Sequence, residues 1–381
     1  MNRPVPVVPS TDAEVLAWLG AVLRDESDPV PPVPAGARQE HVLAIASRQG
    51  VASLVHERLR LRADGSDLHA AFAAAARRQA MQSLWLRAET TRLLDALHAA
   101  GLRVLLLKGV ALAGWLYPAP HLRDCGDLDL LFASHADARR AVEVLVACGY
   151  PQGYEQGSHA YELVRLPAPG AAYALEVDVH WRLLNAPVFA AALDFEALWS
   201  GSIAIPALGP HARGLGPVHA LLHAAMNRVV NLYTDSGDLL KGLYDVRLLA
   251  ERLDPAGWDS MLQLSTQRQL CGVTHAALEA ARSQVGATIR DGVMAALVRR
   301  IPHESLDPQR LGDWLYMQRR SVAALPLGQR LRWMLGRLVP DPGYLRKHHG
   351  ADASLPVLLL RHWGRFPERL FGRRPTGPGA G

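Results

Sequence analysis

The chain has 381 residues, of which 49% are hydrophobic and 20% charged, and its formal net charge is +5 at pH 7. This composition is typical of a folded globular protein with a large core and excludes an intrinsically disordered chain. The small positive excess permits an anionic ligand. However, no dense tract of basic and aromatic residues indicates a nucleic-acid surface, so we do not expect nucleic acid to be a partner.

Three features of the sequence predict a cytoplasmic protein that has no membrane partner. The N-terminus lacks the apolar segment of a secretory signal. No run of about 18 uncharged apolar residues is available to span a bilayer. The three cysteines, Cys125, Cys148 and Cys271, are scattered and form no CxxC motif, which fits a reducing compartment and neither a disulfide framework nor a zinc ribbon.

The first hundred residues are predicted to be helical after a proline-rich start. Residues 1–38 carry prolines at both ends around one short helix. Residues 39–100 place apolar side chains at helical spacing, which predicts a pair of helices and then one long, alanine-rich helix over 67–100. Gly101 suits the position just after that helix ends.

Residues 101–205 alternate between strand and helix patterns and predict a small mixed β-sheet. The expected strands cover 103–107, 128–132, 161–166 and 174–180, and the expected helices cover 109–117 and 135–148. The last two strands are predicted to be joined by a loop at 167–170.

Helical patterns return over residues 206–345, and residues 346–381 are predicted to form a tail that is loose over 373–381. Period-3.6 spacing predicts helices over 217–231, 238–252, 258–270, 273–284, 290–299, 308–319 and 328–337. The motif Pro-Asp-Pro-Gly at 340–343 is expected to end this run. The predicted fold class is therefore α+β: a small mixed sheet forms the core, and helical segments flank it on the N- and C-terminal sides.

The segment LLLKGVALAGWLYPAPHLRDCGDLDLL, residues 105–131, carries the strongest functional signal. Asp127 and Asp129 are two positions apart on a predicted strand, so both carboxylates lie on one face while Leu128 and Leu130 face a core. Repulsion makes such a pair costly unless a cation or a cluster of donors lies between the two carboxylates. The pair therefore predicts a metal site.

The dipeptide Lys108-Gly109 lies between the first predicted strand and the next helix, a position that suits an anionic ligand. Lys108 either holds a phosphate as a point charge or lies at the strand end with its stem on apolar surface. Arg123 precedes the acidic strand. It either neutralises a phosphate or pairs with Asp124.

A later strand, LEVDVHW, brings further acids to the predicted sheet. Glu176, Asp178 and His180 share one face of it. We expect Asp178 to be the third metal ligand beside Asp127 and Asp129, and a register shift of one strand step would put Glu176 there instead. His180 is expected to orient Asp178, with a role as general base as the alternative.

His219 and His223 lie four residues apart on a predicted helix, a spacing that can bind zinc. Since no HExxH glutamate accompanies them, a packed, hydrogen-bonded pair is favoured, and contact with an acceptor substrate is the alternative. Asp245 interrupts an apolar helical stripe. It is expected to pair with one of these histidines or with Lys241.

These motifs resemble the uncharacterised nucleotidyltransferase-like proteins of bacteria, within the polymerase-β-type nucleotidyltransferase superfamily. The resemblance covers roughly residues 40–350. It rests on the 105–131 segment, on LEVDVHWRL, on VHALLHAAMN with KGLYDVRLLAERL and, more weakly, on LVPDPGYLRKHHG. Such proteins are often encoded beside lasso-peptide or polysaccharide genes, which suggests natural-product tailoring.

The resemblance implies a set of residue roles: metal ligation by Asp127, Asp129 and Asp178, phosphate contact by Lys108 and Gly109, and places near the site for Arg123 and His180. The chain departs from the superfamily in two ways. It has Lys-Gly where Gly-Ser or Gly-Gly is usual, and the interval from Gly109 to Asp127 is longer.

The predicted function is a Mg²⁺-dependent nucleotidyltransferase with two metal ions, which moves a nucleoside monophosphate from a nucleoside triphosphate (NTP) to a hydroxyl or amine of a small molecule or peptide. One alternative is a catalytically inactive module of the same fold that binds a peptide or carrier partner. The other is a DxD-type phosphatase with Asp127 as nucleophile.

Overall fold

The computed structural model describes residues 11–24, 31–60, 67–152, 154–156, 160–165, 173–190, 192–233, 238–350 and 353–364. The beginning of the proline-rich start, the predicted loop at 167–170 and the predicted loose tail at 373–381 lie outside the described residues.

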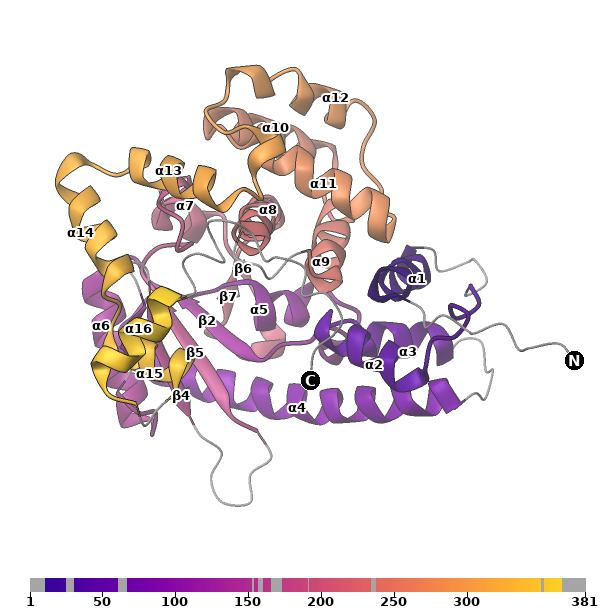
Figure 1. Ribbon diagram of the computed structural model, residues 1–381, viewed down its shortest axis with the longest axis horizontal. Coiled ribbons are helices and arrows are strands. Elements are labelled where there is room, and N and C mark those ends of the chain that lie inside the picture. Colours follow the sequence, from indigo (N-terminus) through magenta and orange to yellow (C-terminus); the bar gives the residue numbers. More distant parts are fainter. Residues whose placement is uncertain are drawn as a thin grey trace, which may run out of the picture.

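A mixed β-sheet lies at the centre of the molecule, with the strand order β3-β4-β5-β2-β1-β7-β6 (Figure 1). The strands are β1 (Leu105–Leu106), β2 (Asp127–Leu131), β3 (Tyr154–Gln156), β4 (Ala160–Arg165), β5 (Leu175–His180), β6 (Ile203–Ala204) and β7 (Arg213–Gly214). The two central strands, β2 and β5, run parallel, while β1 is antiparallel to β2 and β4 is antiparallel to β5.

The predicted strands are confirmed to within a few residues, whereas β3, β6 and β7 were not predicted. Each of these three has only two or three residues, which is too short for an alternating pattern to emerge from the sequence. Since β7 pairs with β1 from beyond residue 205, the sheet draws on a longer stretch of chain than the predicted core.

Helices surround this sheet and confirm the predicted α+β class. Their bounds are α1 (Asp12–Arg24), α2 (Gln39–Arg48), α3 (Ala52–Arg60), α4 (Asp67–Ala99), α5 (Lys108–Trp115), α6 (His135–Ala147), α7 (Phe195–Ser200), α8 (Pro217–Tyr233), α9 (Leu240–Glu251), α10 (Pro255–Gln267), α11 (Cys271–Val285), α12 (Val293–Val298), α13 (Trp314–Ala324), α14 (Leu327–Leu338), α15 (Pro342–His349) and α16 (Leu355–Gly364). None of the described helices combines the length and the apolar content that crossing a bilayer requires.

The long helix α4 ends where the sequence predicts. Gly101 has a φ of +72°. The amide of Gly101 donates to the carbonyl of His98 at 2.8 Å, and the amide of Leu102 donates to that of Leu97 at 3.1 Å. Glycine takes this left-handed conformation without steric cost, which closes the helix and turns the chain towards β1.

The expected end of the helical run at 340–343 is wrong. Helix α15 begins at Pro342, and the side chain of Asp341 accepts a hydrogen bond from the amide of Gly343 at 2.7 Å. Proline is well tolerated in the first turn of a helix because its missing N–H has no partner there, and aspartate is a favoured N-cap. The motif therefore starts a further helix.

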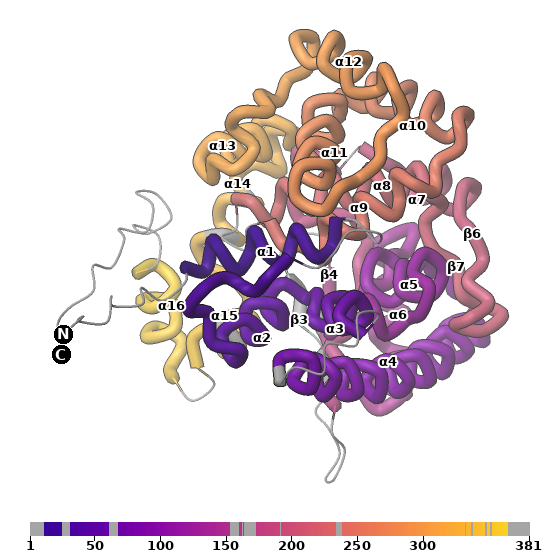
Figure 2. Tube along the Cα trace, turned by 90° about the vertical axis from the view of Figure 1, so that its right-hand side faces the viewer, coloured from indigo at the N-terminus to yellow at the C-terminus, as the bar shows by residue number. Residues whose placement is uncertain are grey.

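Two hydrophobic clusters lie on opposite sides of the sheet. Leu128, Leu130, Val177 and Val179 point into a cluster completed by α4 and α6, as their alternation with acids predicts. The other cluster joins α1–α3 to α8, α9 and α11. Figures 1 and 2 show α4 below the sheet and α10–α12 above it, so the acids of β2 and β5 face the side of the C-terminal helices.

Candidate active site

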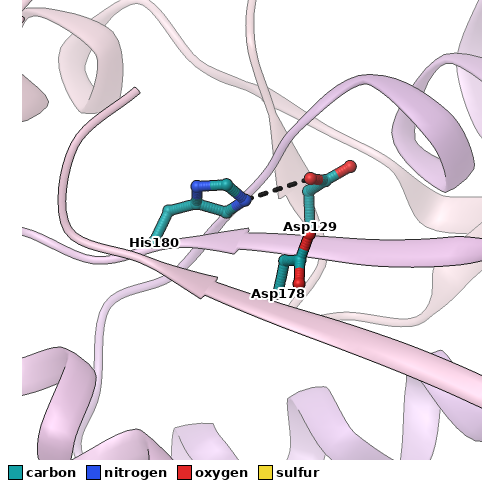
Figure 3. A group of neighbouring side chains, drawn as sticks. All are labelled: Asp129, Asp178 and His180. Carbon is teal, nitrogen blue, oxygen red and sulfur yellow. Dashed lines mark hydrogen bonds and ion pairs between the residues drawn. The ribbon is translucent and has the colours of Figure 1, made fainter. Parts of the chain in front are cut away.

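The parallel register of β2 and β5 brings acids from two strands together. Asp129 pairs with Asp178, and Asp127 pairs with Glu176 two residues earlier on each strand. The ligand atoms of Asp129, Asp178 and His180 all lie within 4.8 Å of one another (Figure 3). In this register Asp178, rather than Glu176, is the acid beside Asp129.

Asp129 is the most buried of these acids, at 2% exposed. Its Oδ1 accepts a hydrogen bond from His180 Nε2 at 3.0 Å and lies 3.3 Å from Lys108 Nζ. Burial by itself would raise the pKa of Asp129, but the charge of Lys108 and the contact with His180 lower it well below its ordinary value. The described hydrogen bond of the His180 ring goes to Asp129, and the expectation that His180 orients Asp178 stays a prediction.

The second carboxylate oxygen of Asp129 shows that this site suits a cation. Oδ2 is buried and accepts no hydrogen bond from any described residue. A buried anionic oxygen without a partner is costly, and carboxylate oxygens are the ligands that magnesium and calcium prefer. The donor set of Asp129 and Asp178 therefore fits a hard divalent cation, with His180 beside it.

Lys108 supplies positive charge to the acids from a strained turn. Its φ is +24°, and Gly109 has a φ of 9° and a ψ of −107° where α5 begins. A non-glycine residue in this region is strained and must be held by its surroundings. Burial by itself would lower the pKa of Lys108, but the charges of Asp129, Asp127 and Asp178 raise it above its ordinary value. Its observed partner is thus a carboxylate, which neither sequence interpretation included.

Arg123 and Asp245 form a buried ion pair between the loop before β2 and helix α9. Arg123 Nε lies 2.9 Å from Asp245 Oδ1, and Nη2 lies 2.7 Å from Oδ2. The two side chains are 7% and 5% exposed. Burial by itself would lower the pKa of Arg123, but Asp245 raises it well above its ordinary value.

The protein side chains expected as partners of Arg123 and Asp245 were wrong, whereas phosphate contact by Arg123 is not tested. Arg123 contacts Asp124 only through the backbone carbonyl of that residue, at 3.3 Å, and not through its carboxylate. Asp245 pairs with neither the histidines nor Lys241 in the described residues. Tyr117, which the sequence interpretation missed, donates its hydroxyl to Asp245 Oδ1 at 2.7 Å. Its sequence signal was a tyrosine at the end of an apolar helix, because a buried tyrosine hydroxyl usually has a polar partner.

The histidines of α8 lie in different surroundings, and no hydrogen bond joins them among the described residues. His223 is 2% exposed, and its Nε2 has no hydrogen-bond partner in the described part of the chain. Burial, with a further contribution from Lys108, lowers the pKa of His223 to about 3. His219 packs on Gly201, where an added Cβ would lie 2.8 Å from its ring. The predicted pair is therefore wrong, and only His223 lies near the acids.

We expect His223 to make the protein sensitive to mild acid. Below pH 6.5 the unfolded chain protonates this histidine, while the folded chain keeps it neutral until about pH 3. The free energy of unfolding should therefore decrease as the pH is lowered from 7, and this group contributes at most about 1.4 kcal/mol per pH unit to that decrease. Denaturant titrations at pH 7, 6 and 5 should show a smaller loss for His223→Gln than for the unchanged protein. Equal losses would contradict a neutral, buried ring.

A cavity of about 200 Å³ lies between α5, α8 and α9 and adjoins the acids at Asp127. Its polar lining includes Lys108 and Asp127 on the sheet side and His223, Asn227 and Lys241 on the helical side. Asn227 was not predicted, although it follows His223 by four residues and so lies on the same helix face. The cavity therefore places Asp127 of β2 next to room for a ligand.

Comparison with known families adds one match. A family model described as an uncharacterised nucleotidyltransferase matches residues 35–285, well over half of the chain. No curated protein and no solved structure matches.

Proposed function

The chain belongs to the uncharacterised nucleotidyltransferase family and is therefore a nucleotidyltransferase, and we propose that it works with magnesium on an NTP. The acceptor in this proposal is a hydroxyl or amine of a small molecule or peptide. The observation that carries the proposal is the meeting of Asp129 and Asp178 across two parallel strands, with Asp129 Oδ2 buried and lacking a hydrogen-bond partner in the described residues.

In the proposed reaction the acceptor oxygen or nitrogen attacks the α-phosphorus of the NTP. A new bond from the acceptor to phosphorus forms, the bond from phosphorus to the bridging oxygen breaks, and pyrophosphate leaves with that oxygen. The acceptor's O–H or N–H bond also breaks, and its proton passes to water. Magnesium ions held by Asp127, Asp129 and Asp178 would neutralise charge on the reacting phosphate oxygens. Glu176, opposite Asp127, is an alternative ligand at the edge of this set.

The other site residues act by binding and orientation. Lys108 offers its ammonium group to a phosphate, and Gly109 lets the turn approach the ligand closely because it has no side chain. His180 holds Asp129 in one orientation through its hydrogen bond. His223 faces the cavity as a neutral ring and suits contact with the acceptor. Arg123 is engaged by Asp245, so in this proposal it positions the loop before β2 and does not hold phosphate.

The shape of the site supports a compact acceptor. The cavity beside Asp127 is bounded by three helices, so the site is enclosed on this side, which suits a small molecule or a peptide side chain better than a polymer. The phosphatase alternative loses support, because the DxD strand β2 pairs antiparallel with the preceding β1. Natural-product tailoring and a cytoplasmic location remain predictions.

Metal-dependent NTP binding tests this function without knowledge of the acceptor. We expect isothermal titration to show binding of α,β-methylene ATP or another non-reacting NTP analogue when Mg²⁺ is present and its loss in EDTA. Asp178→Asn should weaken this binding, whereas Asp291→Asn, an exposed control, should not. No binding of any NTP analogue would contradict the proposal. Tight metal-dependent binding without label transfer to any acceptor would favour the inactive binding module.

Lys108 is expected to compete with the metal for Asp129. Its ammonium group lies 3.3 Å from Oδ1 of that residue, so a cation bound there must overcome its repulsion. Lys108→Met should therefore tighten Mn²⁺ binding by the nucleotide-free protein about tenfold, a change of about 1.4 kcal/mol, while weakening NTP binding. Electron paramagnetic resonance measures free Mn²⁺ directly. Weaker Mn²⁺ binding by Lys108→Met would contradict this competition and would show that the lysine stabilises the metal site.

A further inference from the structure

We propose that Lys241, at the start of α9, binds the β- and γ-phosphates of the NTP. This inference rests on the proposed nucleotidyl transfer and deepens it, because it makes the C-terminal helical region part of the nucleotide site. Sequence interpretation considered Lys241 only as a partner of Asp245, and the structure excludes that pairing among the described residues by giving Asp245 to Arg123 and Tyr117.

Lys241 differs from the other lysine and arginine side chains that line the cavity, because no carboxylate of the described residues neutralises it. Arg123 is engaged by Asp245, and Arg228 is engaged by Asp238 through two contacts of 2.6 Å. Each guanidinium is therefore neutralised by a carboxylate in a two-point contact. Lys108 contacts Asp129. Lys241 also lines the cavity, yet no carboxylate of the described residues forms an ion pair with it.

The stem of Lys241 is held in place by the N-terminal helices. Gly50 has a φ of +67°, and a Cβ built on it would lie 2.4 Å from Lys241 Cδ. The stem of Lys241 therefore occupies the space that a side chain at position 50 would need. The start of α9 is anchored to the same segment: the amide of Leu240 donates to Gln49 Oε1 at 2.9 Å, and the amide of Lys241 donates to the Gln49 carbonyl at 3.2 Å. Lys241 therefore loses less conformational freedom when it binds a ligand.

The position of Lys241 relative to the acids favours a polyphosphate as the ligand. In the proposed reaction the α-phosphate lies at the acids of β2 and β5. The remaining phosphates are anionic, so the acids repel them. Asp127 and Lys241 line the same cavity, and in this proposal the phosphates follow it from the acids to Lys241. An ammonium group is a strong, compact charge that suits phosphate oxygens. Asp238 and Asp245, the other acids of the lining, are neutralised by arginines and do not oppose this path.

The test compares nucleotides of different phosphate number on full-length Lys241→Met. In the presence of Mg²⁺, titration calorimetry with non-reacting NTP analogues should show binding about 10- to 100-fold weaker than in the unchanged protein. Binding of the matching nucleoside monophosphate, which lacks the β- and γ-phosphates, should change less than twofold. Lys241→Arg should retain most of the NTP affinity, because it keeps the charge. Lys347→Met, at the only other lysine besides Lys108, serves as the control.

The outcomes separate this inference from the function on which it rests. Equal NTP affinity in Lys241→Met and the unchanged protein would overturn the role of Lys241 and leave metal-dependent NTP binding intact. Equal weakening of NTP and monophosphate binding would also overturn it, since that result indicates a general disturbance of the cavity. Absence of NTP binding in the unchanged protein would contradict the proposed function itself. Should Lys241→Met fail to fold, the comparison of Lys241→Gln with Lys241→Arg gives the same readout.

Discussion

Asp129→Asn is expected to lower nucleotidyl transfer by roughly 10³-fold, because it removes the charge that Lys108 contacts and that would hold a metal ion in the proposed reaction. Loss of a metal ligand at the reacting phosphate costs several kcal/mol of transition-state stabilisation, and each 1.36 kcal/mol corresponds to a factor of ten in rate. The side chain is 2% exposed and lies beside Lys108 and His180, so no solvent is available to replace its charge. Transfer of label from an α-³²P-labelled NTP measures the effect.

The same variant has a second signature that distinguishes charge from shape. Asparagine preserves the volume of Asp129 but leaves the Lys108 ammonium without its carboxylate, so Mn²⁺ binding should weaken even though the protein folds. Asp291→Asn is the matched control, because that aspartate is exposed and lies at the start of the segment leading to α12. Label transfer that persisted in Asp129→Asn at more than a tenth of the original rate would refute the role of this carboxylate.

Asp245→Ala is expected to destabilise the protein by about 3–5 kcal/mol, because it leaves the Arg123 guanidinium buried without its counter-ion. The ion pair is more than nine-tenths buried on both sides, and Tyr117 loses the acceptor of its hydroxyl in the same change. Burial and the charge of Asp245 raise the pKa of Tyr117 well above its ordinary value, so this hydroxyl stays protonated and needs an acceptor. Chemical denaturation followed by circular dichroism measures the loss.

Two controls make this prediction specific. Asp259→Ala removes an exposed ion pair in which the side chain of Arg290 is 43% exposed and that of Asp259 is 68% exposed. This change should cost less than about 1 kcal/mol. The combined variant Tyr117→Phe, Arg123→Met, Asp245→Leu replaces the whole polar group by apolar side chains and should recover most of the lost stability. Equal losses in the free energy of unfolding for Asp245→Ala and Asp259→Ala would contradict the larger cost predicted for breaking the buried pair.

The sequence by itself determined the local parts of the site. Alternation of acids with leucine and valine in β2 and β5 identified both strands and the face that each acid occupies, because a strand places every second side chain on one side. The end of α4 at Gly101 followed from the conformational freedom of glycine. The two strands and their acids were therefore predictable before any contact between them was known, and the α+β class followed from the order of these elements.

Only the tertiary structure decided which side chains meet. The pairing of Asp129 with Asp178 depends on the register of two strands that the whole of α6 and the β3–β4 hairpin separate along the chain. Arg123 has an aspartate as its immediate neighbour yet pairs with Asp245, 122 residues away. Local patterns report which face of an element is buried, whereas the choice among several charged partners depends on how distant elements pack.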